Sequence, residues 1–120
     1  MSTPFMWFDL CVADTGRAAE FYRQLFGWDI NDAGVAGYQS WIGAGPRPWA
    51  GIVSAGPDSA GHWLPYVVVD DLDRATKQAV ALGATVVSDA SDGPAGTSVT
   101  IADPGGGARL ALFKPFPEGS

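Results

Sequence analysis

A short pattern, an aspartate followed three and four residues later by arginine and alanine, occurs twice in this chain and limits its fold more than any other feature. After each copy comes a helical apolar pattern that ends at a glycine, Gly27 or Gly83, and then a short strand-like run. A repeat of this length indicates two copies of one supersecondary unit. The repeated residues keep a constant offset of 57 (71 − 14): Asp14, Arg17 and Ala18 return as Asp71, Arg74 and Ala75.

The segments around the two repeats predict the order βαβββ in each half. Alternating apolar and polar residues indicate strands, the 3.6-residue period indicates helices, and Gly- and Pro-containing runs separate them. We predict a single α+β domain, 1–120, with module one at about 5–54, a linker at 55–61 and module two at about 62–114. The expected strands are 5–12, 28–30, 38–42, 49–54, 63–69, 85–88, 98–102 and 109–113, and the expected helices follow Asp14 and Asp71.

The first strand is expected to have two different faces. Phe8, Leu10 and Val12 form an apolar face that should meet the helix, and Trp7, Asp9 and Cys11 form the other. Asp14 and Asp71 each precede a helix, so we interpret them as N-caps rather than as a catalytic pair of carboxylates.

Composition excludes several classes of protein. With 47 % hydrophobic and 17 % charged residues the chain is typical of a globular domain, and no apolar run is long enough to span a membrane. A net charge of −6 argues against nucleic acid; it indicates solubility or attraction of a cationic small molecule. The single cysteine and the absence of a signal-peptide pattern predict a cytoplasmic location.

Three segments carry a resemblance to a known family. They are L-C-V-A-D-T-G-R-A-A-E-F-Y-R-Q-L-F-G-W (10–28), V-V-V-D-D-L-D-R-A (67–75) with A-L-G-A (81–84), and D-P-G-G-G-A-R-L-A-L-F (103–113). Together they resemble the vicinal oxygen chelate superfamily, which includes glyoxalase I, extradiol dioxygenases, fosfomycin-resistance enzymes and bleomycin-resistance proteins. The resemblance implies tandem βαβββ modules that form a curved mixed-sheet cup, and a homodimer.

In metal-dependent members of that superfamily, His, Glu or Gln side chains from the first and last strands hold a divalent ion. The matching positions here are Trp7, Leu64 and Ala111, and the fourth lies in the strand 49–54, which has no such side chain. Indole and aliphatic groups do not coordinate divalent cations, so we predict no metal and no cofactor. A displaced set of His62, Asp9 and a water is the alternative; otherwise His62 is an ordinary exposed or hydrogen-bonded residue.

Aromatic residues suggest a different content for the cup. Trp7 stands at a metal-ligand position, and Tyr66 and Phe113 are expected on the same strand faces as Leu64 and Ala111, toward the cup. Such flat apolar walls would suit planar or cationic ligands. The alternative for Trp41 and Trp49 is packing in the sheet core or at a dimer interface. Cys11 is interpreted as a small buried thiol rather than as a nucleophile. No catalytic residue is predicted. The candidate ligand-binding residues are Trp7, Asp9, Cys11, Trp41, Trp49, His62, Leu64, Tyr66, Arg109, Ala111 and Phe113.

Three functions remain open at this point. The first is a metal-independent binding protein, similar to the bleomycin-resistance group, that sequesters a planar aromatic or cationic natural product or drug. The second is a glyoxalase-like lyase, isomerase or dioxygenase with an atypical or absent metal site. The third is a scaffold with a vestigial cup, acting in dimerisation or regulation.

Overall fold

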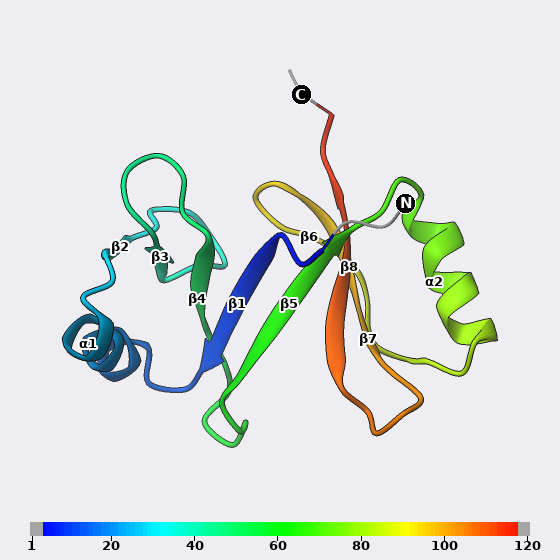
Figure 1. Cartoon of the computed structure of the whole chain (residues 1–120), viewed down its shortest axis with the longest axis horizontal. Helices are drawn as coiled ribbons and strands as arrows, with labels where there is room; N and C mark the ends of the chain where they lie inside the picture. Colours follow the sequence, from blue (N-terminus) through cyan, green and yellow to red (C-terminus); the bar gives the residue numbers. More distant parts are fainter. Residues whose placement is uncertain (1–3, 118–120) are drawn as a thin grey trace. The chain divides into compact units, whose positions relative to one another are not determined.

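The computed structural model describes residues 4–117 and contains two compact units (Figure 1). The first unit is Trp7–Leu64; of the described residues, the second comprises 4–6 and 65–117. In chain order the elements of the first repeat are β1 (Trp7–Val12), α1 (Thr15–Phe26), β2 (Ile30–Asp32), β3 (Ser40–Ile42) and β4 (Ala50–Ser54). Those of the second are β5 (His62–Val68), α2 (Leu72–Ala81), β6 (Thr85–Asp92), β7 (Gly96–Ala102) and β8 (Arg109–Pro115).

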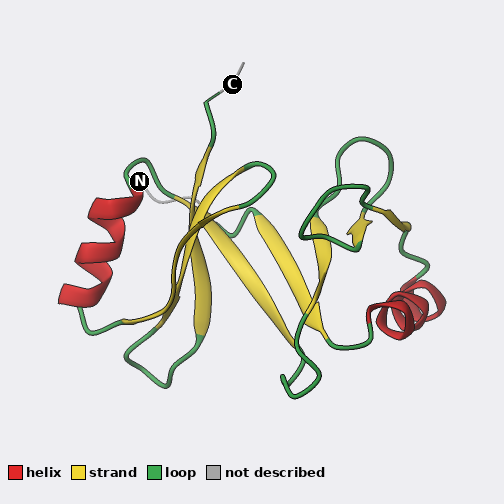
Figure 2. Ribbon diagram, turned by 180° about the vertical axis from the view of Figure 1, so that it is seen from behind, coloured by secondary structure: helices red, strands yellow, loops and turns green. Residues whose placement is uncertain are grey.

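Strand pairing is the same in both repeats. The first strand pairs in parallel with the fourth, β1 with β4 and β5 with β8, and the remaining neighbours are antiparallel. The hydrogen-bonded orders are therefore β2-β3-β4-β1 and β5-β8-β7-β6. Both views of the ribbon show one helix beside the strands of each repeat (Figure 2). The predicted α+β class with tandem βαβββ modules is confirmed.

The core of the first unit lies between α1 and its strands. Leu10 and Ile52 pack against Ala19 of the helix, and Phe8 and Val12 adjoin this cluster. The face predicted from the alternation of β1 is therefore the one that the helix covers. Trp7, Asp9 and Cys11 are left on the opposite face.

The second unit repeats this arrangement with smaller helix residues. Val99, Ile101 and Leu112 form its buried cluster, against which Ala75 and Ala79 of α2 pack. Alanines allow the helix to approach the strands closely but bury little apolar surface, so no α2 residue is fully buried.

Every strand differs from its predicted limits by one to four residues at one end or both, and two of the differences have a clear structural cause. β6 runs to Asp92, four residues beyond the predicted end at Ser88, because it continues to pair with β7 through two shifts of register. β2 begins at Ile30 rather than Trp28, and Trp28 packs against the core of the first unit instead. Both predictions were wrong because local composition does not record pairing partners.

The two helices begin with the same N-cap, as predicted. Asp14 accepts a hydrogen bond from the backbone N–H of Arg17, and Asp71 accepts one from Arg74, both at 3.0 Å. α1 ends at Gly27, whose φ of 69° is in the left-handed region that glycine adopts without strain. The repeated sequence therefore encodes a repeated helix start.

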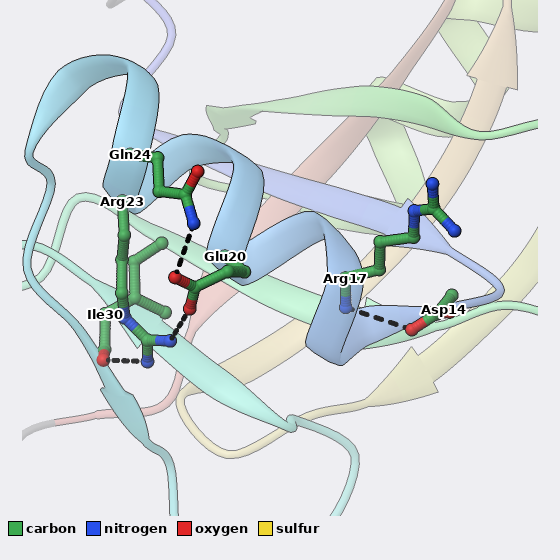
Figure 3. A network of polar contacts seen from close by, with 6 residues as sticks. All are labelled: Asp14, Arg17, Glu20, Arg23, Gln24 and Ile30. Atoms are coloured by element: carbon green, nitrogen blue, oxygen red, sulfur yellow. Dashed lines mark hydrogen bonds and ion pairs between the residues drawn. The ribbon is translucent and has the colours of Figure 1, made fainter.

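A polar network connects α1 to the strand that follows it (Figure 3). Glu20 accepts hydrogen bonds from Gln24 at 2.9 Å and from Arg23 at 3.5 Å. Arg23 also donates to the backbone carbonyl of Ile30 at 2.6 Å. The exposed ion pair contributes little to stability, whereas the bond to Ile30 fixes the end of the helix relative to β2.

Among the helices of residues 4–117, neither α1 nor α2 has the length and apolarity needed to cross a membrane.

Replacing either N-cap should destabilise the protein by a similar amount. Asp14→Ala and Asp71→Ala each remove an acceptor from free backbone N–H groups, which costs about 1 kcal/mol of unfolding free energy. Urea denaturation measures this, with Asp58→Ala in the exposed linker as the control. Two cap variants no less stable than that control would contradict the assignment.

Candidate functional site

A buried carboxylate lies on the face of β1 opposite the helix. Asp9 is only 5 % exposed, and one of its oxygens, Oδ1, accepts two hydrogen bonds. Trp7 donates from Nε1 at 2.8 Å and Tyr38 from its hydroxyl at 2.6 Å. Burying a carboxylate is costly unless donors replace water, and these two donors offset that cost. They also fix the orientation of both rings.

A third aromatic ring, Trp41, packs against the two rings that bond to this carboxylate. Trp7 meets Trp41 with centroids 5.8 Å apart and Tyr38 with centroids 6.4 Å apart, both edge to face. Tyr38 and Trp41 are in closer contact, at 4.6 Å. We call Trp7, Asp9, Tyr38 and Trp41 the Trp7 cluster. Offset and edge-to-face arrangements are the favourable ones for aromatic rings, so these ring contacts stabilise the cluster.

Gly51 makes room for this cluster. Gly51 lies in β4, where it pairs with Asp9 of β1 on one side and with Trp41 of β3 on the other. A Cβ atom there would collide with Cε1 and Cδ1 of the Tyr38 ring and lie 3.3 Å from Cζ3 of Trp41. The tyrosine ring therefore lies directly over the strand backbone.

The sequence predicted three members of the cluster and missed Tyr38. Trp7, Asp9 and Trp41 were candidate ligand-binding residues, and the structure brings them together. Tyr38 precedes β3 at the end of a loop, where strand alternation gives no orientation. A glycine in the middle of β4 was the available signal, since such a glycine often marks a close approach of another group.

Cys11 follows on the same face, half-buried, with its Sγ 4.0 Å from the backbone oxygen of Asp9. Burial, and to a lesser extent the charge of Asp9, raise the pKa of this thiol from 9.0 to about 11. At neutral pH it is therefore protonated, which favours the interpretation as a small buried thiol over a nucleophile.

Trp49 lies in a different aromatic group. Its ring contacts Phe8 and Trp28 at 6.3 and 4.8 Å and stacks on Trp63 at 6.5 Å, on the side of the sheet that faces α1. Trp49 was a candidate ligand-binding residue with packing as the alternative, and the structure places it apart from Trp7, among the aromatic rings on the helix side. Trp49 lies just before β4, so the alternation of that strand does not govern its direction.

The second unit carries its own aromatic pair on the face opposite α2. Tyr66 is the partner of Ala111, as the predicted parity requires, and its ring meets Phe113 at 5.8 Å. Ser98 lies across from Phe113 on β7. Arg109, at the start of β8, is exposed.

The side chains at the three named metal-ligand positions do not fit a divalent ion. Leu64 and Ala111 are buried hydrocarbon groups, and the indole N–H of Trp7 is donated to Asp9. His62 is exposed, with Nδ1 3.1 Å from the carbonyl oxygen of Ala60. Nowhere in residues 4–117 do three His, Cys, Asp or Glu side chains gather in a metal-binding arrangement.

Comparison with known proteins identifies the family. The model of the glyoxalase-like domain matches residues 6–109. The chain belongs to the glyoxalase-like domain family. This agrees with the resemblance to the vicinal oxygen chelate superfamily that the sequence motifs carry.

Curated relatives of this glyoxalase-like chain are longer than it is. It is 30 % identical over 132 residues to the anthracycline biosynthesis protein DnrV of Streptomyces peucetius, which covers 95 % of the chain and 48 % of DnrV. It is 32 % identical over 110 residues to CFP32 of Mycobacterium bovis, a protein provisionally named a glyoxylase, covering 85 % and 42 %. The chain thus spans about half the length of the relatives it matches.

A solved structure with the same fold is methylmalonyl-CoA epimerase from Mycobacterium tuberculosis. The TM-score is 0.65 at 21 % identity, and the match covers 98 % of this chain and 91 % of the epimerase chain. At this identity, the likeness shows only that the two proteins share a fold.

Gly51→Ala should destabilise the protein. The added methyl group meets the Tyr38 ring and forces it off Asp9, at a cost of roughly 1–3 kcal/mol in unfolding free energy. Gly56→Ala is the matched control, because a Cβ there would have only Ser59 Oγ nearby, at 3.8 Å. Chemical denaturation of both variants measures the difference; equal stabilities would argue against the close packing of Tyr38.

Cys11 should react slowly with iodoacetamide in the folded protein. A rise in pKa from 9.0 to about 11 lowers the thiolate fraction at pH 8 about 100-fold. Alkylation followed by mass spectrometry should therefore be much faster in 6 M guanidinium chloride. Asp9→Asn should accelerate it modestly, since burial is the larger cause. Equal rates in folded and denatured protein would contradict the raised pKa.

Proposed function

We propose that this chain is a metal-independent binding protein that sequesters a planar aromatic small molecule, including cationic ones. The observation that carries the proposal is the Trp7 cluster: two aromatic rings hydrogen-bonded to a buried carboxylate and a third ring, Trp41, packed against both. Trp7 stands where the resemblance places a metal ligand. Trp7, Trp41 and Asp9 are the proposed contacts of the first unit. Tyr66 and Phe113 are the proposed contacts of the second.

The chemistry of the cluster suits such a ligand. Aromatic rings offer flat faces for stacking, and their negative π faces attract cations. The carboxylate of Asp9 favours a ligand with a donor or a positive charge. Because hydrogen bonds already fix Trp7 and Tyr38, little ordering is required on binding, which favours affinity.

Two further observations support this proposal. DnrV is named for the biosynthesis of anthracyclines, which are flat polycyclic aromatic compounds, and this chain resembles about half of that protein. The net charge of −6 favours the approach of cationic molecules over anionic ones.

A glyoxalase-like enzyme is the second candidate, favoured by the similarity to CFP32. Metal-dependent chemistry of that kind needs donor side chains, and the aliphatic Leu64 and Ala111 supply none. Metal analysis of protein purified without chelator separates the two candidates. A stoichiometric divalent ion would overturn the metal-independent proposal.

Binding of planar probes tests the proposed function directly. Daunorubicin and uncharged anthraquinone should bind saturably by calorimetry, and Trp7→Ala and Trp41→Leu should each weaken binding about tenfold through loss of one ring contact. Trp49→Leu is the matched control, because it removes a tryptophan of the same unit on the other face of the sheet. Far-ultraviolet circular dichroism verifies folding.

Two outcomes would contradict the proposal. One is the absence of saturable binding across a panel of planar probes that includes both charged and neutral members. The other is that Trp49→Leu lowers the affinity while Trp7→Ala and Trp41→Leu leave it unchanged. That result would place the binding surface elsewhere.

A further inference from the structure

The second unit contains a hollow between α2 and the irregular strand β6. Its volume is about 490 Å³, and small-molecule sites in proteins occupy roughly 300–1,000 Å³. It lies on the helix side of the sheet, whereas the pair of Tyr66 and Phe113 lies on the opposite face. Four apolar side chains and two carboxylates line it: Leu72, Val86, Ala90, Val99, Asp73 and Asp89.

A bulge in β6 brings two residues to the edge of this hollow where a regular strand would bring one. The second register shift of β6 lies between its pairs with Thr100 and Ser98 of β7. In that interval β7 has one residue, Val99, and β6 has two, Asp89 and Ala90. Bulges of this kind re-aim the side chains that they carry. The carboxylate of Asp89 and the methyl group of Ala90 therefore both border the hollow.

The small inward side chains of α2 leave the space open. Ala75 and Ala79 pack on the buried cluster that contains Val99, which is 4 % exposed. Leu72 and Thr76 lie one turn apart along the hollow and are only half-buried. The hydroxyl of Thr76 donates to the backbone carbonyl of Leu72 at 2.7 Å, so it is already hydrogen-bonded within the helix. The interior of the hollow is therefore mainly hydrocarbon.

The charged groups at the rim are mostly acidic. Asp73 and Asp89 are both exposed, and no described lysine or arginine is among the lining residues. Lys77 lies close by, with its Nζ 3.0 Å from Oδ2 of Asp73 in an exposed ion pair that is weak in water. Two carboxylates and one ammonium group leave a net charge of −1 (1 − 2). This charge favours a cationic ligand.

The first turn of α2 borders the same hollow, and a helix N-terminus by itself favours an anion. Here that end is already capped, because Asp71 accepts a hydrogen bond from a backbone N–H of the first turn at 3.0 Å. An anion would also approach the carboxylates of Asp73 and Asp89. The charges at the rim therefore oppose an anionic ligand.

We propose that this hollow binds a small amine with an apolar body. The ammonium group lies against the carboxylate of Asp89, and the hydrocarbon part covers Val86 and Val99. The ligand need be neither planar nor aromatic, because aliphatic side chains and not rings line the hollow. The proposal does not depend on ligand binding at the Trp7 cluster.

Three cyclohexyl compounds test the proposal, because they share one apolar body and differ in charge. They are cyclohexylamine, cyclohexanol and cyclohexanecarboxylate, each titrated into the millimolar range at neutral pH. Amide NMR spectra of the isotope-labelled chain measure the affinity and locate the site. The amine should saturate and shift the amides of 72–76, 86–90 and 99, and the carboxylate should bind at least tenfold more weakly.

Variants at exposed positions separate the contributions of charge and space. Asp89→Asn keeps the shape and removes the charge, so it should weaken cyclohexylamine about fivefold and leave cyclohexanol within twofold. Ala90→Phe fills the hollow and should weaken both compounds at least tenfold. Asp92→Asn is the matched control: Asp92 is an exposed carboxylate of the same strand, bonded to Thr97 and outside the hollow, so this change should leave both affinities within twofold.

Three results would overturn the proposal. The first is the absence of saturable shifts with cyclohexylamine. The second is an equal affinity for all three compounds, or an affinity for the amine that neither Asp89→Asn nor Ala90→Phe lowers. The third is a set of shifts confined to the first unit and lost in Trp7→Ala. That last result would place the amine at the Trp7 cluster, so it would support the proposed function while excluding the hollow.

Discussion

The parallel pairing of β1 with β4 is the constraint on which the first unit depends. It brings Asp9 opposite Gly51, where the missing side chain leaves room for the Tyr38 ring, and it brings Leu10 opposite Ile52 in the core. The same register thus positions the carboxylate on one face of β1 and the core residues on the other. A shift by one residue would expose the core residues and bury a carboxylate away from its donors.

Much of the fold follows from local signals in the sequence. The N-caps, the helix lengths and the two faces of β1 all depend on residues close together in the chain, so Asp14, Asp71 and the alternation from Phe8 to Val12 were sufficient to predict them. The limits of β6 were not predictable in this way. Its outer half, S-D-A-S-D, resembles a loop in composition and is ordered by pairing with β7.

The candidate site was predicted only where strand alternation applies. Trp7 and Asp9 lie in β1, so strand alternation predicted their common face, whereas Trp41 in β3 was a candidate whose face the sequence did not assign. Tyr38 and Trp49 lie just outside strands, and each points where packing requires. Tyr38 fills the space above Gly51, whereas Trp49 joins Trp28 and Phe8 on the helix side. The sheet of the first unit therefore separates two aromatic groups with different surroundings.

The irregular course of β6 has a consequence for solubility. In its unit β6 pairs with β7 alone and leaves its other edge open, and an open edge presents backbone groups to which strands of other molecules can add. Two register shifts disturb the spacing of those groups, and the carboxylates of Asp89 and Asp92 lie along the same strand. Both features make β6 a poor template for fibrillar growth, and the residues that look most like a loop thereby protect the edge of the sheet.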